Sequence, residues 1–190
     1  MNTKSLSGGK LAGGNPSRGR VSQDYYATHP DSTKALLEVE DIIYPALEPA
    51  CGEGHISKLL GTNTISTDLI DRGYGDWFGD FLRCSYPNIE TVITNPPFAL
   101  FQEFLEKALM VANKKVIMFG KLQALEGQKR ATFLEITPLK TVYVFKKRQQ
   151  PMRNGKEFDD KTGKKMSSTM AFAWYVWEIG YKGEPTIKWI

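Results

Sequence analysis

The sequence has few of the residues that cross-link small proteins or bind metals. It contains two cysteines and two histidines in 190 residues. Neither Cys51 nor Cys84 stands in a CxxC or Cys/His spacing, which argues against a disulfide framework and a structural zinc site. Both thiols are expected to be reduced, and no residue pattern supplies a base that would activate either one. We therefore predict no metal site, and we interpret His29 and His55 as ordinary residues at loop–helix junctions.

Long apolar runs are also missing. No stretch approaches the ~20 apolar residues of a membrane span, and the N-terminus lacks the apolar segment of a secretory signal. Hydrophobic residues make up 41% of the chain and charged residues 24%, an ordinary globular composition that excludes a fully disordered or collagen-like protein. A chain of this length buries roughly 70% of its unfolded surface, enough for one core. We expect a soluble, cytoplasmic protein.

Charge is distributed unevenly along the chain. The formal net charge is +4: residues 1–23 carry four basic residues and no acid (+4), residues 24–139 carry 10 basic and 16 acidic (−6), residues 140–165 carry 9 basic and 3 acidic (+6), and residues 166–190 balance. An acidic body with a basic arm and a basic C-terminal lobe indicates a polyanion held by one side of the molecule. Solvated lysine-rich loops are the alternative interpretation.

Composition also divides the chain. Residues 1–20 are rich in Gly, Ser, Asn and Lys and are expected to be a flexible basic arm. Residues 21–190 are expected to form a single domain, with a basic loop over about 146–168. Strands are predicted at 42–47, 64–67, 91–94, 115–119, 141–145, 170–179 and 186–190, and helices at 31–39, 56–60, 101–111 and 123–134. This alternation predicts an α/β fold with a mostly parallel sheet, helices on both faces and antiparallel C-terminal strands.

Polar residues end three of the predicted strands. Glu48, Asp68 and Asn95 stand at positions where an open α/β sheet binds ligands, outside the carboxyl ends of its strands. Residues 48–54 read Glu-Pro-Ala-Cys-Gly-Glu-Gly, and glycines in such a turn allow backbone to approach a ligand. Asp68, some 20 residues beyond Glu48, fits the acid that binds a ribose diol. A third glycine is missing, which argues against a dinucleotide.

The most specific pattern is Asn95-Pro96-Pro97-Phe98. Two prolines directly after a buried strand remove two backbone donors and make a stiff turn. Such a turn presents the Asn95 side-chain oxygen and a backbone carbonyl, two acceptors that suit the two hydrogens of an amino group. A plain strand-ending turn would explain the prolines, but not the asparagine and the aromatic residue beside two acidic strand ends.

With these motifs, the sequence resembles the S-adenosylmethionine-dependent DNA adenine-N6 methyltransferases of phages and prophages. The likeness extends from Asp24 to Ile190. Residues 24–30, Asp-Tyr-Tyr-Ala-Thr-His-Pro, resemble the N-terminal cofactor motif of that family, and Asn95 to Phe98 match its catalytic motif. The strands at 142–148 and 173–178 resemble the closing strands of its small members. The resemblance implies a Rossmann-like class I methyltransferase fold. It also implies that the protein acts in the cytoplasm of a bacterial or phage-infected host cell.

The resemblance also implies roles for individual residues. It assigns catalysis to Asn95, Pro96, Pro97 and Phe98. Binding of S-adenosylmethionine is assigned to Tyr26, Thr28, Glu48, Pro49, Ala50, Cys51, Gly52, Gly54, Asp68, Asp80, Phe81 and Asn95. Within this set, Asp68 would bind the ribose of the cofactor, and Asp80 and Phe81 would bind its adenine. Phe98 would stack on a flipped target base, and Phe145 is a second stacking candidate or a core residue. Trp174, Tyr175 and Trp177 are assigned to the core.

The implied function is methyl transfer to the exocyclic amino nitrogen of adenine in DNA, with Lys146, Lys147, Arg148 and Arg153 holding phosphates. We expect no separate target-recognition domain, so recognition would rest on a loop, a homodimer or a partner chain. Three alternatives keep the chemistry and change the acceptor: cytosine N4, ribosomal RNA or a protein glutamine. A fourth is a binding module without turnover, although intact Asn95, Asp68 and glycine positions argue against degeneration.

Overall fold

The computed structural model describes residues 25–149, 152–153, 155–156, 158, 162–164 and 170–190. The expected arm at 1–20 and most of the basic loop after residue 149 lie outside these residues. The elements follow in the order β1 (Tyr26–Ala27), α1 (Pro30–Leu37), β2 (Ala46–Glu48), α2 (Ser57–Leu60), β3 (Thr64–Asp68), β4 (Trp77–Phe78), β5 (Ile89–Thr94), α3 (Phe101–Val111), β6 (Ala112–Lys121), α4 (Gln128–Glu135), β7 (Leu139–Val144), β8 (Met152–Arg153), β9 (Phe172–Glu178) and β10 (Thr186–Trp189). Short 3-10 helices span Phe98–Leu100 and Leu122–Leu125.

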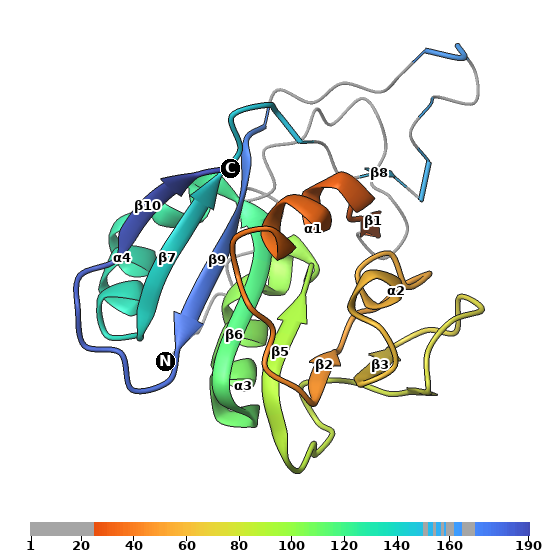
Figure 1. The fold of residues 1–190 in the computed structure, drawn as a ribbon, viewed down its shortest axis with the longest axis horizontal. Coiled ribbons are helices and arrows are strands. Elements are labelled where there is room, and N and C mark those ends of the chain that lie inside the picture. Colours follow the sequence, from red (N-terminus) through yellow and green to blue (C-terminus); the bar gives the residue numbers. More distant parts are fainter. Residues whose placement is uncertain (1–24, 150–151, 154, 157, 159–161, 165–169) are drawn as a thin grey trace, which may run out of the picture.

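Among the described residues, eight strands form one sheet in the order β10-β7-β9-β6-β5-β2-β3-β4 (Figure 1). Strand β9 is antiparallel to both of its neighbours, and every other pair in this sheet is parallel. From β2 the chain proceeds outward through β3 and β4, and then returns to β5 on the other side of β2. The order therefore reverses between β2 and β5, and the carboxyl ends of these two strands flank the crevice where open α/β sheets bind ligands.

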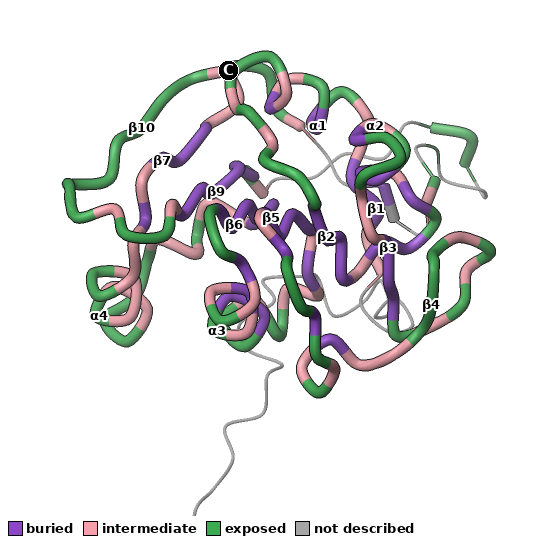
Figure 2. Tube along the Cα trace, turned by 60° about the horizontal axis from the view of Figure 1, so that its bottom comes forward, coloured by how far each residue is buried: buried purple, intermediate pink, exposed green. Residues whose placement is uncertain are grey.

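Helices cover both faces of the sheet. In Figure 2 the sheet is seen nearly edge-on, with α3 and α4 on one side and α1 and α2 on the other. Side chains alternate between the two cores because successive residues of a strand point to opposite faces. Val92 of β5 packs with the α3 cluster, whereas its neighbour Ile93 packs with the α1 and α2 cluster. The expected mostly parallel α/β sheet with helices on both faces is confirmed.

Strand β9 carries the largest core side chains. Trp174, Tyr175 and Trp177 are each 0% exposed, as the sequence predicted for the core. Each indole N–H donates a hydrogen bond, from Trp174 to the Ser32 carbonyl at 2.8 Å and from Trp177 to the Thr137 hydroxyl at 3.0 Å. Buried tryptophans are stable in a core when this polar atom finds a partner. Because β9 sits between β6 and β7, these residues join the two halves of the sheet.

Two predicted elements were wrong in extent. The strand expected at 42–47 begins at Ala46, because Ile43 and Tyr44 stay 38% and 39% exposed and Pro45 has no N–H to donate. The helix expected at 123–134 is a 3-10 turn followed by α4. Gly127 separates the two with φ +106°, a conformation that interrupts a helix.

Most other elements were predicted well. Helix α3 has the bounds 101–111 expected from its apolar spacing. Of the two C-terminal strands, β9 is antiparallel as expected, whereas β10 runs parallel to β7. The two-residue strand β4 lies in the stretch 70–87 that was expected to be loop. No helix in the described part of the chain is long and apolar enough to cross a membrane.

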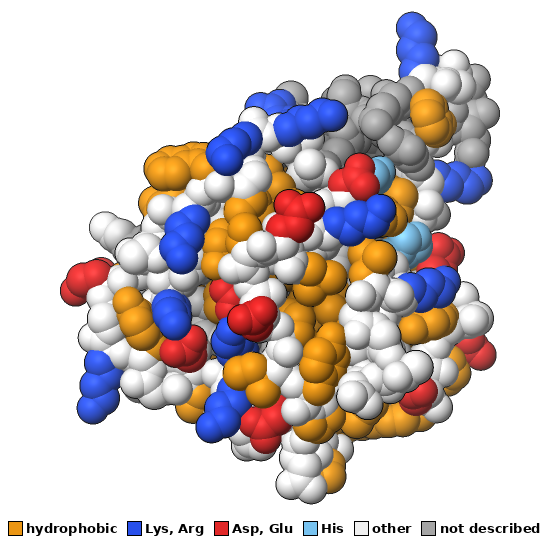
Figure 3. Space-filling view, in the orientation of Figure 1, with side chains coloured by type: hydrophobic (Ala, Val, Ile, Leu, Met, Phe, Trp, Pro, Cys, Tyr) orange, Lys and Arg blue, Asp and Glu red, His pale blue; other side chains and the backbone are white. Residues whose placement is uncertain are grey.

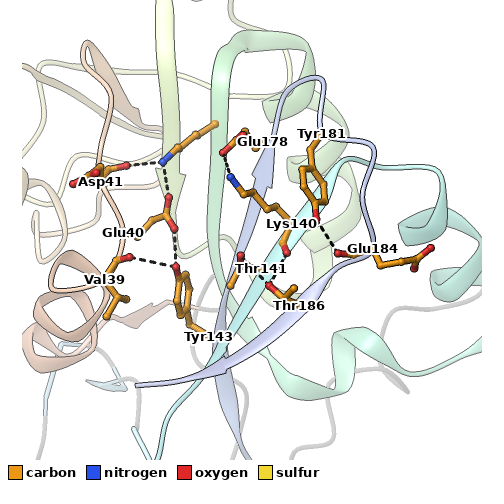
Figure 4. Close-up of polar contacts among 11 residues, drawn as sticks. Val39, Glu40, Asp41, Lys140, Thr141, Tyr143, Glu178, Tyr181, Glu184 and Thr186 are labelled. Carbon is orange, nitrogen blue, oxygen red and sulfur yellow. Dashed lines mark hydrogen bonds and ion pairs between the residues drawn. The ribbon is translucent and has the colours of Figure 1, made fainter.

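A polar network anchors the segment after α1 to the sheet (Figure 4). The Glu40 carboxylate accepts a bond from the Lys115 ammonium of β6 at 2.5 Å and another from the Tyr143 hydroxyl of β7 at 2.8 Å. Lys115 also donates to the Asp41 carbonyl at 3.0 Å. The side chains of Lys115 and Glu40 are only 11% and 12% exposed. Glu40 therefore ties together two strands that are not neighbours in the sheet.

We expect Glu40→Gln to lower the free energy of unfolding by about 3 kcal/mol, because it leaves the Lys115 ammonium without its carboxylate in a largely buried site. Tyr143→Phe removes the hydroxyl that donates to Glu40 and to the Val39 carbonyl, and is expected to cost about 1 kcal/mol. Urea denaturation of both variants measures the two losses. A Glu40→Gln loss no larger than that of Tyr143→Phe would show that the ion pair is not what anchors this segment.

Candidate functional site

A cavity opens at the sheet crevice, where β2, β3 and β5 end. Of the residues assigned to catalysis, Asn95, Pro96, Pro97 and Phe98 all line it. Of those assigned to the cofactor, nine more line it: Tyr26, Thr28, Glu48, Pro49, Ala50, Cys51, Asp68, Asp80 and Phe81. Segments separated by more than fifty residues in the sequence thus meet around one space. The two glycines of the set do not line the cavity.

Those glycines make room for aromatic side chains. Gly52 and Gly54 have φ angles of +57° and +78°. A Cβ at Gly52 would lie 2.6 Å from the Tyr25 ring, and one at Gly54 would lie 2.5 Å from the Tyr74 ring. The sequence predicted that the glycines admit a ligand. In the structure they admit Tyr25 and Tyr74, which pack directly on the loop.

Two carboxylates hold the loop between β2 and α2. Asp68 accepts the Gly52 N–H on Oδ2 at 2.8 Å and the Ile70 N–H on Oδ1 at 3.0 Å. Glu48 accepts the Ser57 N–H at 2.7 Å and also the Ser57 hydroxyl. Each carboxylate oxygen can accept more than one hydrogen bond. Asp68, at the cavity wall, therefore keeps acceptor capacity for ligand hydroxyl groups.

Burial changes the acidity of two groups at this site. Burial raises the pKa of Glu48 to about 8, against the Ser57 hydrogen bonds that lower it, and the nearby Asp68 raises it further. Burial also raises the pKa of the Cys51 thiol to about 12. Cys51 is thus a neutral thiol at physiological pH, which agrees with its interpretation as a residue without nucleophilic function.

The Asn95 amide has a fixed orientation. Its Nδ2 donates to the backbone carbonyl of Tyr26 at 2.7 Å. This bond uses the nitrogen end of the amide and leaves the oxygen end, an acceptor, for a ligand in the cavity. Pro96 follows and contributes a carbonyl but no N–H. The turn therefore offers two acceptors.

Phe98 forms an aromatic wall next to these acceptors. Its ring stacks on Tyr26 with centroids 5.6 Å apart, and it meets Phe172 at the same distance. The Lys121 ammonium lies over it, 4.9 Å from the centroid. Phe145, the other candidate for stacking on a base, packs 6.2 Å from Phe119 and is not among the residues that line the cavity.

Both residues of the predicted Asp80–Phe81 pair line the cavity, and Phe81 also belongs to the core. The Phe81 side chain is 2% exposed and packs on Tyr86 and Phe104. Asp80 accepts the Leu82 N–H at 3.0 Å and lies 3.3 Å from the Arg83 guanidinium. The pair reaches the cavity from the loop that follows β4, the strand next to β3.

Several cavity residues were not predicted from the sequence. Tyr25 and Arg72 line it, with the guanidinium 4.1 Å from the tyrosine ring centroid. His55 also lines it, and burial lowers its pKa. Its position directly after the glycine turn was a signal in the sequence, whereas no spacing connects Tyr25 to Arg72. His29, by contrast, caps α1 by accepting the Asp31 N–H at 3.2 Å.

Two buried polar atoms at the cavity lack partners. The Thr28 hydroxyl and the His55 Nδ1 have no hydrogen-bond partner among the described residues. Both residues line the cavity. Together with Asp68 they give a donor and acceptor set that fits an amino-acid end and a ribose, the polar parts of S-adenosylmethionine. The described residues contain no group of three His, Cys, Asp or Glu side chains that could hold a metal.

The predicted phosphate-binding residues begin where β7 ends. Lys146, Lys147 and Arg148 are exposed, and Figure 3 shows Lys and Arg side chains along the top of the view, in the region where β7 ends. Strand β8 then pairs antiparallel with β1, with Arg153 opposite Tyr26. The side chain of Arg153 lies outside the described residues. The basic segment therefore runs beside the strand whose carbonyl holds Asn95.

No protein-family model and no curated protein matches the chain. Solved structures do. A protein of Listeria monocytogenes described as a class I S-adenosylmethionine-dependent methyltransferase is similar, with a TM-score of 0.55, 11% identity, and coverage of 96% of this chain and 69% of the other. The chain has the class I methyltransferase fold.

Two further structures are similar over most of this chain. A modification subunit of a type I restriction enzyme from Vibrio vulnificus has a TM-score of 0.53 and 13% identity, and covers 95% of this chain. The chain spans about half of that subunit, 48% of its length. The 23S rRNA methyltransferase ErmE has a TM-score of 0.54 and 15% identity, with 83% of this chain and 71% of the other covered. At these identities the likeness establishes the fold.

Glu48 gives the fold a pH dependence. The folded protein keeps the Glu48 proton up to about pH 8, whereas the unfolded chain releases it near its ordinary pKa of 4.5. The native state binds more protons in this window, so the contribution of Glu48 to stability falls as pH rises from about 5 to about 8.

Urea denaturation of the wild type and Glu48→Gln at a series of pH values tests this expectation. Subtracting the free energy of unfolding of Glu48→Gln from that of the wild type removes the contributions of His55 and the other titrating groups. This difference should decline as pH rises from about 5 to about 8. A difference that does not change with pH would place the pKa of Glu48 near its ordinary value.

Proposed function

We propose that this chain is an S-adenosylmethionine-dependent methyltransferase that acts on the N6 amino group of adenine in DNA. The observation that carries the proposal is the orientation of Asn95. Its amide nitrogen is held by Tyr26 at 2.7 Å, which leaves the side-chain oxygen and the Pro96 carbonyl as two acceptors on a stiff turn. The turn stands at the crevice of a class I methyltransferase fold.

When bound, S-adenosylmethionine supplies a methyl group on a sulfonium sulfur, which departs as a neutral thioether. Asp68 would accept the ribose hydroxyls, and Asp80 would lie on the adenine side. Tyr26, Thr28 and the loop 48–54 would enclose the methionine end. His55, which no sequence pattern assigned, joins this last group because it lines the same cavity.

The acceptor needs activation because the lone pair of an exocyclic amine is delocalised into its ring. Asn95 Oδ1 and the Pro96 carbonyl would accept the two amino hydrogens, which favours a tetrahedral nitrogen with its lone pair aimed at the methyl group. The same two dipoles stabilise the positive charge that develops on nitrogen. Phe98 would stack on the base, which must leave the duplex to reach the cavity. The methylated nitrogen then releases one of its two hydrogens as a proton to solvent, and no covalent enzyme intermediate is needed.

The charge distribution supports a nucleic acid over a protein acceptor. Exposed Lys146, Lys147 and Arg148 follow β7, in a segment of net charge +6 over residues 140–165. The Vibrio vulnificus structure is described as a restriction-enzyme modification subunit, which favours DNA as the acceptor. Phosphate contacts of this kind add affinity without reading sequence. Target recognition would then depend on a loop or on a partner chain.

Asn95→Ala is expected to lower methyl transfer at least about 100-fold while cofactor affinity, measured by calorimetry, changes little. Labelled S-adenosylmethionine is offered with unmethylated DNA, RNA and protein in parallel, and the product is identified after digestion to nucleosides or amino acids. Asn113→Ala, which removes an exposed asparagine bonded to Glu90, is the matched control.

Turnover retained in Asn95→Ala would remove Asn95 from catalysis. Label recovered in RNA or protein would keep the mechanism and replace the acceptor. Bound cofactor with no label in any of the three would favour a binding module.

Reversal of charge at Lys146, Lys147 and Arg148 to Glu is expected to weaken DNA binding and to reduce the slope of log affinity against log salt by up to about 3. Lys182→Glu is the control, because this exposed lysine follows β9, and the antiparallel pairing of β9 with β7 puts it at the other end of the strands from Lys146. Fluorescence anisotropy with a labelled duplex, at a series of salt concentrations, measures the affinity and the salt slope of each variant. An unchanged slope in the triple variant would show that DNA lies elsewhere.

A further inference from the structure

His55 is a polar residue of the cavity wall with an unsatisfied ring nitrogen. It follows Gly54 in the loop that leads into α2, and it lines the cavity. Its Nδ1 is buried and makes no hydrogen bond within the part of the chain that the structure describes. A buried polar atom without a partner has lost its bonds to water and gained none in return. Beside a cavity, such an atom points to a ligand group as its partner.

The imidazole of His55 is neutral at physiological pH. Burial lowers its pKa from the ordinary value of 6.5, the Glu53 carboxylate raises it, and Lys58 and His29 lower it further. A neutral imidazole carries one N–H, on either Nδ1 or Nε2, and its other nitrogen is a hydrogen-bond acceptor. Nδ1 is therefore either a donor or an acceptor, but not both.

The position of Glu53 decides between these two tautomers. Its Oε2 atom lies 3.9 Å from Nε2 of His55. An N–H dipole directed at a negative charge is stabilised, whereas a nitrogen lone pair directed at the same charge is repelled. The hydrogen consequently belongs on Nε2. Nδ1 then carries the lone pair and is an acceptor.

An acceptor at this position selects one group of the cofactor. The methionine end of S-adenosylmethionine carries an ammonium, which has donors only, and a carboxylate, which has acceptors only. The lone pair of Nδ1 can accept a hydrogen bond from the ammonium and would repel the carboxylate. The charge of Glu53 acts in the same direction, and its effect on His55 exceeds the opposite effect of Lys58.

We propose that His55 binds the amino-acid ammonium of S-adenosylmethionine, with Nδ1 as the hydrogen-bond acceptor. This inference rests on the proposed function, since it requires that cofactor in the cavity. It does not depend on which molecule accepts the methyl group. It assigns one group of the cofactor to one atom of a residue outside the sequence motifs.

The test removes one group from the ligand and one atom from the protein. S-adenosylhomocysteine, its analogue without the amino group and its analogue without the carboxylate are each titrated into the protein by calorimetry. The wild type should bind the deaminated analogue about 10-fold more weakly than S-adenosylhomocysteine. His55→Gln should lose a similar factor for S-adenosylhomocysteine and for the decarboxylated analogue, but nothing for the deaminated one.

His55→Asn is the matched control. The asparagine amide stands as many bonds from Cβ as Nδ1 does in histidine, whereas the glutamine amide stands as far as Nε2. His55→Asn should therefore keep most of the affinity for all three ligands. Both variants remove the ring, so a general disturbance of the loop would weaken the binding of all three ligands in both proteins.

A loss in His55→Gln that is confined to the two ligands with an amino group supports the contact. A loss confined to the two ligands with a carboxylate would overturn it and would place the hydrogen on Nδ1. An equal loss for all three ligands, or no loss, would also refute it, while binding of S-adenosylhomocysteine by the wild type would still support the proposed function. A wild-type protein that binds none of the three overturns both proposals.

Discussion

The hydrogen bond between Asn95 and the Tyr26 carbonyl fixes which end of the Asn95 amide is available in the cavity. An amide side chain can turn either its donor or its acceptor end toward a ligand, and this bond selects the acceptor end. Tyr26 also stacks on Phe98 and pairs, through β1, with β8. A displacement of this short strand would therefore affect the amide, the aromatic wall and the basic segment together.

Around this contact, acidic side chains hold the surrounding backbone in place. Asp68 accepts a backbone N–H of the loop that joins β2 to α2, and Glu48 accepts the N–H of Ser57, the first residue of α2. Glu48 is 2% exposed, and the cost of burying its charge appears as its raised pKa. Asp68 is 9% exposed and stays at the cavity wall. Both acids line the cavity, and Asp68 is the more exposed of the two.

The sequence carries enough information for the architecture and for most of the cavity. Apolar periodicity gives α3 at its observed bounds, and strand-end positions bring Asp68 and Asn95 together because parallel strands share a carboxyl edge. The sequence does not reveal that Tyr25 fills the space above Gly52, because no local spacing relates residues that meet through a loop. The position of Lys121 over Phe98 depends on the register of β6 against β5, which a single sequence does not specify.

The place of β9 has a consequence for how the chain reaches its fold during synthesis. Strands β6 and β7 pair with β9 and not with each other, so the centre of the sheet is incomplete until residues 172–178 have been made. Before then both strands have open edges, which invite pairing with other chains. Contacts between residues so far apart in sequence also form slowly. A nascent chain of this protein therefore has to be kept from aggregating until its last tryptophan-rich strand arrives.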